Sequence, residues 1–151
     1  MGSRTFLKYW LPVVVWMLLI FSASTDLLST QRTSRFIGPF LRWLKPGISE
    51  STVKQVQLLI RKIAHLTEYA ILAGLLWRAL RKPLTNDSRP WSWRQAGWAW
   101  TFTALYAVTD EIHQSFVASR HGSPWDVLID STGAALGILL IWQMGRWRNA
   151  W

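Results

Sequence analysis

Four apolar stretches run along the chain, and segments rich in charged and turn-forming residues separate them. They lie at about residues 9–25, 56–77, 95–115 and 124–145. A helix needs about 20 mostly apolar residues to cross the hydrocarbon core of a membrane, and each stretch approaches that length. The pattern predicts an all-α fold, a polytopic membrane protein with four transmembrane helices in an up-down bundle. Residues 1–151 would then form one domain.

The first stretch has the flanks of a membrane-inserted segment. Arg4 and Lys8 precede it, and the uncharged sequence from Tyr9 to Thr25 contains LPVVVWMLLIF. A signal peptide has similar features, and Ser22-Ala23-Ser24 resembles a cleavage site. Because three more apolar stretches follow, we interpret this one as the first transmembrane helix.

The segment between the first two stretches contains apolar residues at helical spacing, accompanied by basic ones. The apolar positions are Phe36, Ile37, Phe40, Leu41 and Leu44, and the basic ones are Arg35, Arg42 and Lys45. This pattern is typical of a short amphipathic helix that lies in the lipid headgroup region. A lid over a functional site is the alternative interpretation.

The net charge of +9 is spread between the apolar stretches and forms no continuous basic arm. This distribution favours an anionic membrane surface over nucleic acid as the partner. Lysine and arginine in the short loops place both termini in the cytoplasm by the positive-inside rule. The absence of cysteine excludes disulfides and thiolate metal sites.

Ionisable residues collect in one layer of the expected bundle. A carboxylate in the middle of a membrane helix costs roughly 2.5 to 3.5 kcal/mol, so it usually faces protein or a wet cavity. With the termini inside, the start of the second span, the end of the third and the start of the fourth meet at the outer leaflet. The candidates there are Lys62, His65, Glu68, Asp110, Glu111, His113, Gln114, Arg120, Asp126 and Asp130.

Helical spacing divides these candidates by face. Asp110, His113 and Gln114 point one way, whereas Glu111 points roughly 100° around the helix. On the last stretch, Asp126 and Asp130 share a face with Gly133 and Gly137. Two glycines four residues apart allow a neighbouring helix to approach closely, which would draw both aspartates into the bundle.

Several of these residues also form a recognisable pattern. Lys62 and His65 are followed by Glu68-Tyr69, then by DEIHQ at 110–114, Arg120, and Asp126 with Asp130 before the G-x-x-x-G pair. This pattern resembles the VanZ-like family. The resemblance implies a small multipass protein of the bacterial cytoplasmic membrane, and the name-giving members of the family confer low-level resistance to teicoplanin.

Our leading hypothesis is an outer-leaflet polar pocket that binds or modifies an anionic, lipid-linked molecule of the cell envelope. Lys62 and Arg120 would hold its phosphate or carboxylate. Glu68, Asp110 and His113 would be the catalytic candidates, for proton transfer. His65, Glu111, Gln114, Asp126 and Asp130 would complete the binding site.

Two alternatives stay open. In the first, the charged residues form a structural network in a non-enzymatic binding or scaffold module, with Arg61, Lys62 and Arg120 pairing with the carboxylates. In the second, a divalent metal is bound, because the layer holds suitable oxygen and nitrogen ligands. The residues of this second alternative are His65, Glu68, Asp110, His113 and Asp130. The spacing is not specific for a metal, so the leading hypothesis includes neither a metal nor a cofactor.

Overall fold

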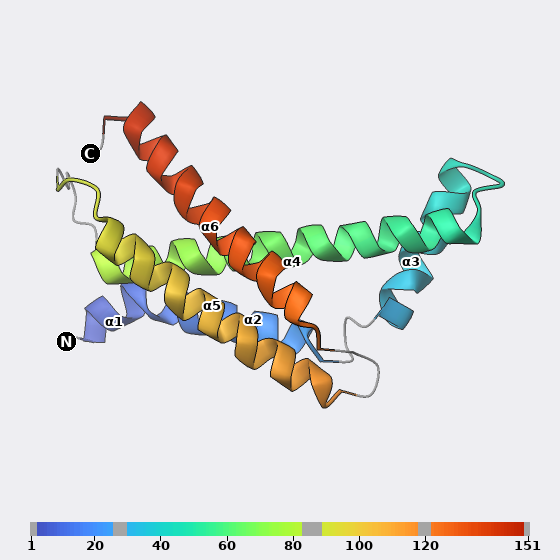
Figure 1. Cartoon of the computed structure of the whole chain (residues 1–151), viewed down its shortest axis with the longest axis horizontal. Helices are drawn as coiled ribbons and strands as arrows, with labels where there is room; N and C mark the ends of the chain where they lie inside the picture. Colours follow the sequence, from blue (N-terminus) through green and yellow to red (C-terminus); the bar gives the residue numbers. More distant parts are fainter. Residues whose placement is uncertain (1–2, 26–29, 83–88, 118–121, 150–151) are drawn as a thin grey trace.

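The computed structural model describes residues 3–25, 30–82, 89–117 and 122–149, which form six helices and no strand (Figure 1). The helices are α1 (Ser3–Tyr9), α2 (Leu11–Ala23), α3 (Thr30–Leu44), α4 (Glu50–Arg81), α5 (Trp93–Ser115) and α6 (Pro124–Trp147). The predicted all-α fold is confirmed.

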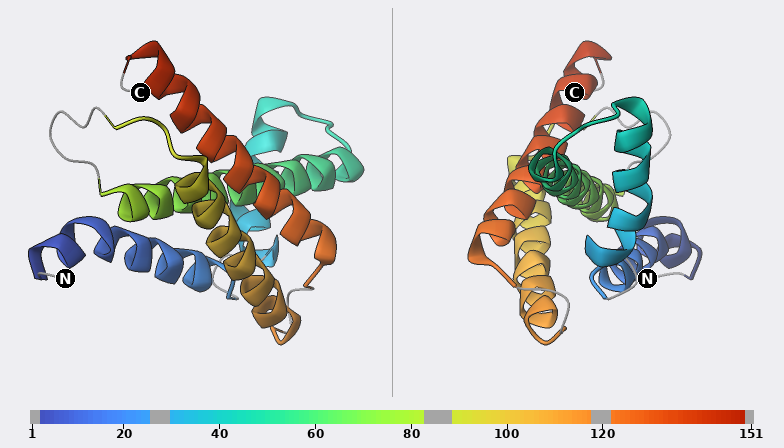
Figure 2. Two further views of the ribbon diagram at one scale, coloured as in Figure 1. Left: turned by 60° about the vertical axis from the view of Figure 1, so that its left-hand side comes forward. Right: turned by 90° about the vertical axis from the view of Figure 1, so that its right-hand side faces the viewer.

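The 32-residue helix α4 is the centre of the molecule. Helices α5 and α6 pack against it and against each other, while α2 and α3 contact it separately. Viewed along α4, helices α5 and α6 lie on one side and α2 and α3 on the other (Figure 2). Chain direction alternates between α2, α4, α5 and α6, and both termini lie at the same end of the molecule (Figure 1).

A serine residue immediately precedes each of the three longest helices, which explains their sharp starts. A serine hydroxyl at the N-cap accepts a hydrogen bond from one of the first backbone N–H groups, which have no partner within the helix. The hydroxyls of Ser49, Ser92 and Ser123 accept from the N–H groups of Thr52, Gln95 and Trp125 at 3.2, 3.4 and 3.2 Å. Pro124, in the first turn of α6, requires no such partner.

The first apolar stretch, predicted as one helix over 9–25, contains α2, and Trp10 separates it from the preceding helix α1. Pro12 explains the break, because proline has no N–H to donate to the carbonyl four residues earlier, which is that of Lys8. Arg78 on α4 donates a hydrogen bond to this carbonyl oxygen from Nη1 at 3.1 Å. The long helix α4 thus replaces the bond that the proline removes.

Helices α4 and α6 cross at the predicted pair of glycines. A Cβ atom at Gly133 would lie 2.8 Å from Cα of Leu66, and one at Gly137 would lie 2.8 Å from Cα of Ala70. Real side chains do not approach a backbone so closely, so only glycine permits this packing. The crossing places Asp130, one turn before Gly133, beside residue 65 of α4.

Apolar side chains cover much of the outside of the bundle. Leu18, Leu105 and Leu140 are 60, 58 and 61% exposed, whereas the interior holds polar residues as well as apolar ones. On α3, Phe36, Phe40, Trp43 and Leu44 are exposed at spacings that place them on one helical face. The helix predicted in the first loop is therefore present, with an exposed apolar face.

By length and composition, α6 is the one helix in the described ranges that is able to cross a membrane, and α2 is apolar but has only 13 residues. Helices α4 and α5 are long enough, with 32 and 23 residues, but they carry charged and polar side chains among their apolar ones. The four-span arrangement consequently remains a proposal, which is developed below.

Candidate functional site

Polar side chains are buried where α4, α5 and α6 meet. Asp130 is fully buried, and Asp110, Glu111 and Gln114 are 2, 5 and 2% exposed. A buried carboxylate is stable only when hydrogen bonds, opposite charge or a bound ion compensate for the water that it has lost. The partners of each carboxylate therefore indicate its role.

Asp110 is held by hydroxyl and amide groups. Its Oδ2 accepts hydrogen bonds from Ser24 Oγ at 2.8 Å, Tyr69 OH at 3.2 Å and Gln114 Nε2 at 2.9 Å. Ser24 follows α2, Tyr69 belongs to α4 and Gln114 to α5. This single oxygen thus joins three helices. Tyr106 and Trp16 strengthen the same junction, since Tyr106 donates to the Met17 carbonyl at 2.7 Å and Trp16 to that of Glu68 at 2.9 Å.

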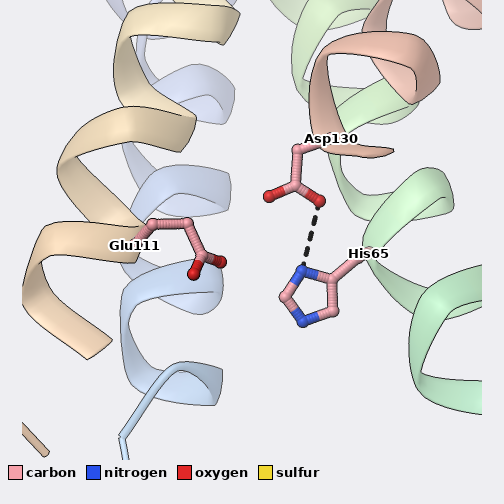
Figure 3. Close-up of side chains that lie close together, drawn as sticks. All are labelled: His65, Glu111 and Asp130. Atoms are coloured by element: carbon pink, nitrogen blue, oxygen red, sulfur yellow. Dashed lines mark hydrogen bonds and ion pairs between the residues drawn. The ribbon is translucent and has the colours of Figure 1, made fainter. Parts of the chain in front are cut away.

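Glu111, the next residue, points to a different group. His65 of α4, Glu111 of α5 and Asp130 of α6 converge, and each offers a ligand atom within 4.8 Å of the other two (Figure 3). His65 Nδ1 lies 3.2 Å from Asp130 Oδ1. We call these three residues the His-Glu-Asp cluster. Its members come from the three helices that pack most closely.

The backbone before α6 folds onto Glu111 and fixes it. The N–H of Ser123 donates to Glu111 Oε2 at 2.8 Å, and Gln114 Nε2 donates to Oε1 at 3.2 Å. A Cβ atom at Gly122 would overlap the Glu111 carbonyl oxygen. Glycine at position 122 therefore allows the turn to approach α5 and supply the N–H of Ser123.

A cleft of about 50 Å³ opens beside the cluster between α4 and α6. It is large enough for water or a small polar group. Its lining residues are Leu58, Arg61, Lys62, His65, Asp126 and Ile129. Two cationic side chains thus surround the approach to His65.

A larger groove of about 420 Å³ lies on the opposite flank of α6, between α5 and α6. Its lining is mainly apolar and consists of Val108, Glu111, Ile112, Ser115, Gly122, Ser123, Pro124 and Val127. His65 lines the cleft and Glu111 lines the groove, and Asp130 lies between them. The cluster therefore links a cationic cleft with an apolar groove.

The structure brings most of the predicted site residues together, but in two groups. Lys62, His65 and Asp126 line the cleft, and Glu111 and Asp130 converge on His65, whereas Asp110 and Gln114 are hydrogen-bonded to each other toward α2. His113 does not join either group. Its ring stacks on Phe21 of α2 at 4.4 Å, and its Nε2 is buried without a hydrogen-bond partner in the described part of the chain. Arg120 lies outside the described residues.

Glu68 is not part of the cluster either, although it lies on the same helix as His65. Of the five metal ligands considered from the sequence, only His65 and Asp130 belong to the group with metal-binding geometry in the described ranges, and Glu111 is added. The sequence predicted one polar layer, whereas the structure divides these residues between the surroundings of Asp110 and the His-Glu-Asp cluster.

Three partners had no role in the sequence interpretation. These are the hydroxyls of Ser24 and Tyr69 and the backbone N–H of Ser123. Ser24 is separated from Asp110 by 86 residues, so spacing does not reveal the contact. Tyr69 follows Glu68 in the recognised pattern, which is the one signal that pointed to it.

Comparison with known proteins agrees with the resemblance seen in the sequence. The model of the VanZ/LLP1 family matches residues 9–146, a range that includes the Asp110 junction, the His-Glu-Asp cluster and both adjoining hollows. Neither a curated protein nor a solved structure matches the chain. Because the family model covers nearly the whole sequence, the chain belongs to the VanZ/LLP1 family.

Proposed function

We propose that the protein spans the bacterial cytoplasmic membrane and binds an anionic, lipid-linked molecule of the cell envelope. The observation that carries this proposal is the arrangement around α6. A cleft lined by Arg61 and Lys62 lies on one flank and an apolar groove on the other, with buried carboxylates between them. An amphiphile has a charged part that suits the cleft and an apolar part that suits the groove.

The membrane arrangement that we propose has four spans, formed by α1 with α2, then α4, α5 and α6. The alternating chain direction in Figure 1 suits an up-down bundle. Leucine side chains face outward and carboxylates inward, which is the distribution expected when lipid surrounds the bundle. Helix α3 would lie on the membrane surface, with Phe36, Phe40 and Trp43 in the headgroup region.

Both termini would lie in the cytoplasm. Their end of the molecule holds a chain of aromatic contacts, from Trp77 to Trp91 at 5.2 Å and from Trp93 to Trp142 at 5.6 Å. Arg81 and Arg146 lie over two of these rings. Tryptophan and arginine together are typical of the cytoplasmic interface.

The absence of cysteine from the chain permits a direct test of this topology. A single cysteine in place of Trp125 should react with an impermeant maleimide in intact cells. A cysteine in place of Asn149 should react only after the cells are permeabilised. Labelling of Asn149→Cys in intact cells would contradict the proposed orientation.

The ligand is assigned from the chemistry of the two hollows. Arginine and lysine bind phosphate and carboxylate through charge-assisted hydrogen bonds. The groove beside Glu111, Ile112 and Val127 is suited to a hydrocarbon chain. An envelope lipid with an anionic headgroup has both parts, and it accords with the link between the name-giving VanZ proteins and teicoplanin resistance. Glu68, Asp110 and His113, the candidates for proton transfer, line neither of these two hollows.

Lipid mass spectrometry of gently purified protein tests this assignment. We expect an anionic envelope lipid to co-purify with the wild-type chain. Replacing both Arg61 and Lys62 with Gln should lower the lipid content at least tenfold, since each charged hydrogen bond contributes about 1.5–3 kcal/mol. Lys54→Gln is the matched control, because Lys54 is exposed on the same helix and does not line the cleft. Equal lipid content in all three proteins would overturn the proposal.

One observation favours a second candidate, the non-enzymatic scaffold. Asp110 accepts three hydrogen bonds from three different helices, as a structural tie would. If the other acids also serve only as ties, their removal would lower thermal stability in detergent, and lipid content would fall only in proportion to folded protein.

A further inference from the structure

The His-Glu-Asp cluster combines one imidazole with two carboxylates inside the protein. His65 has a side chain 17% exposed, Glu111 is 5% exposed and Asp130 is fully buried. Figure 3 shows the three side chains pointing into one shared space from three helices. Because the three side chains come from different helices, the packing of those helices determines how close they lie.

The surrounding backbone holds each ligand in place. Gly133 brings α6 against Leu66, next to His65, and so sets the distance between His65 and Asp130. Gly122 and the N–H of Ser123 fix Glu111 from the other side. Metal sites require this kind of support, because their ligands must be held in position before the ion binds.

An unused oxygen also faces the cluster. Asp130 Oδ2 is buried and has no hydrogen-bond partner in the described part of the chain. In Figure 3 this second oxygen points toward the side on which Glu111 lies. A buried carboxylate oxygen without a partner is costly, and a second carboxylate nearby adds repulsion. A divalent cation between the two would remove both penalties.

The donor set and its spacing suit a first-row transition metal. Imidazole nitrogen and carboxylate oxygen are ligands for Zn²⁺ and Mn²⁺. Two ligand atoms at about 2.1 Å from a tetrahedral zinc lie roughly 3.4 Å apart. His65 Nδ1 and Asp130 Oδ1 are 3.2 Å apart, and all three ligand atoms lie within 4.8 Å of one another, a separation that modest side-chain rotation closes.

We propose that His65, Glu111 and Asp130 bind one divalent transition-metal ion, Zn²⁺ or Mn²⁺, in each chain. Three protein ligands leave a coordination position open, as in metal sites that bind substrate. His65 also lines the cleft that contains Arg61 and Lys62, so the open position is within reach of a group held there. The metal site does not depend on the identity of the envelope ligand.

Metal uptake by purified protein tests this proposal without any lipid. The full chain is treated with a chelator, incubated with Zn²⁺ or Mn²⁺, separated from free ions and subjected to elemental analysis. We expect one ion per wild-type chain. His65→Ala, Glu111→Gln and Asp130→Asn should each lower the affinity by at least tenfold. Glu68→Gln is the matched control, because it removes a carboxylate from the helix of His65 outside the cluster, and it should bind like wild type.

A second measurement covers variants that fail to fold. Bound metal stabilises the folded state in proportion to the logarithm of its concentration, so Zn²⁺ or Mn²⁺ should raise the Tm of chelated wild-type protein. Mg²⁺ should have little effect, because it prefers oxygen ligands and retains its water. No uptake and no shift of Tm with wild type would overturn the metal site, as would equal uptake by the three cluster variants. Either result would leave the lipid measurement unaffected.

Discussion

Asp110 and Glu111 are neighbours in sequence, both are buried, and their surroundings differ completely. Asp110 points toward α2 and α4 and accepts hydrogen bonds from Ser24, Tyr69 and Gln114. Glu111 points toward α4 and α6, where it joins His65 and Asp130. Successive residues on a helix point about 100° apart, which is enough to direct the two carboxylates to different neighbours.

The comparison shows how one helix can carry a structural acid beside a functional one. Three neutral donors share Oδ2 of Asp110, while its Oδ1, like Oδ2 of Asp130, is buried without a hydrogen-bond partner in the described part of the chain. The His-Glu-Asp cluster differs because it brings an imidazole and a second carboxylate to Asp130 and lies between a cleft and a groove. Both acids are buried, so burial alone does not distinguish these roles. The side chains that surround each carboxylate do distinguish them.

The largest effect is expected at Gly133, on which the crossing of α4 and α6 depends. Gly133→Leu would place a side chain against the Leu66 backbone and force α4 and α6 apart, which should cost about 3 kcal/mol or more. Thermal unfolding in detergent measures the loss. The control is Gly97→Ala on α5, where a Cβ atom meets nothing within 4 Å. Alanine is the better helix former, so this variant should be as stable as wild type or up to about 1 kcal/mol more stable. An unchanged Tm for Gly133→Leu would refute the packing described here.

Asp110→Ala should give the next largest loss of stability. The substitution leaves the hydroxyls of Ser24 and Tyr69 without this acceptor, while the amide of Gln114 keeps Glu111 Oε1. Unpaired buried groups of this kind cost about 1–3 kcal/mol each, so a total loss of about 3 kcal/mol is expected in the free energy of unfolding. A loss below that of a surface substitution would show that Asp110 is not a structural tie.

Glu111→Gln should change stability less, by under about 1.5 kcal/mol. The amide has nearly the shape of the carboxylate and still accepts the N–H of Ser123. Metal uptake, in contrast, should fall strongly. The comparison between the two acids would fail if this variant unfolded as readily as Asp110→Ala.

The smallest effect is expected for Tyr69→Phe, at about 1 kcal/mol. Asp110 would keep two of its three donors, and the ring of Tyr69 would stay in the core. A double-mutant cycle with Asp110→Ala measures the interaction between the two side chains. Strict additivity of the two losses would show that the hydrogen bond of 3.2 Å contributes nothing.

Helix positions were largely predictable from the sequence, because capping and apolar length are local properties. The last two stretches, predicted at 95–115 and 124–145, correspond to helices Trp93–Ser115 and Pro124–Trp147. The break at Trp10 was not predicted, although Pro12 carries the signal for it. Helix α4 extends beyond its predicted range at both ends, since the polar residues around Ser51 continue a helix that Ser49 caps.

The sequence pointed to most residues of the candidate site, but it did not show which of them lie together. Helical spacing placed Glu111 on a different face from Asp110, yet it did not reveal which helix each face would meet. That depends on the α4 and α6 crossing and on partners such as Ser24, which is distant in sequence. Spacing also grouped His113 with Asp110, whereas contact with Phe21 separates them.

The central claim is that metal binding depends on Glu111 and fold stability on Asp110. The most direct test is the amount of Zn²⁺ or Mn²⁺ taken up per folded molecule of Asp110→Asn and of Glu111→Gln. The metal content of Asp110→Asn should equal that of wild type even though less folded protein is recovered, and that of Glu111→Gln should fall strongly at near-normal yield. Metal contents per folded molecule that stay equal in both variants, or that fall only in Asp110→Asn, would contradict the claim.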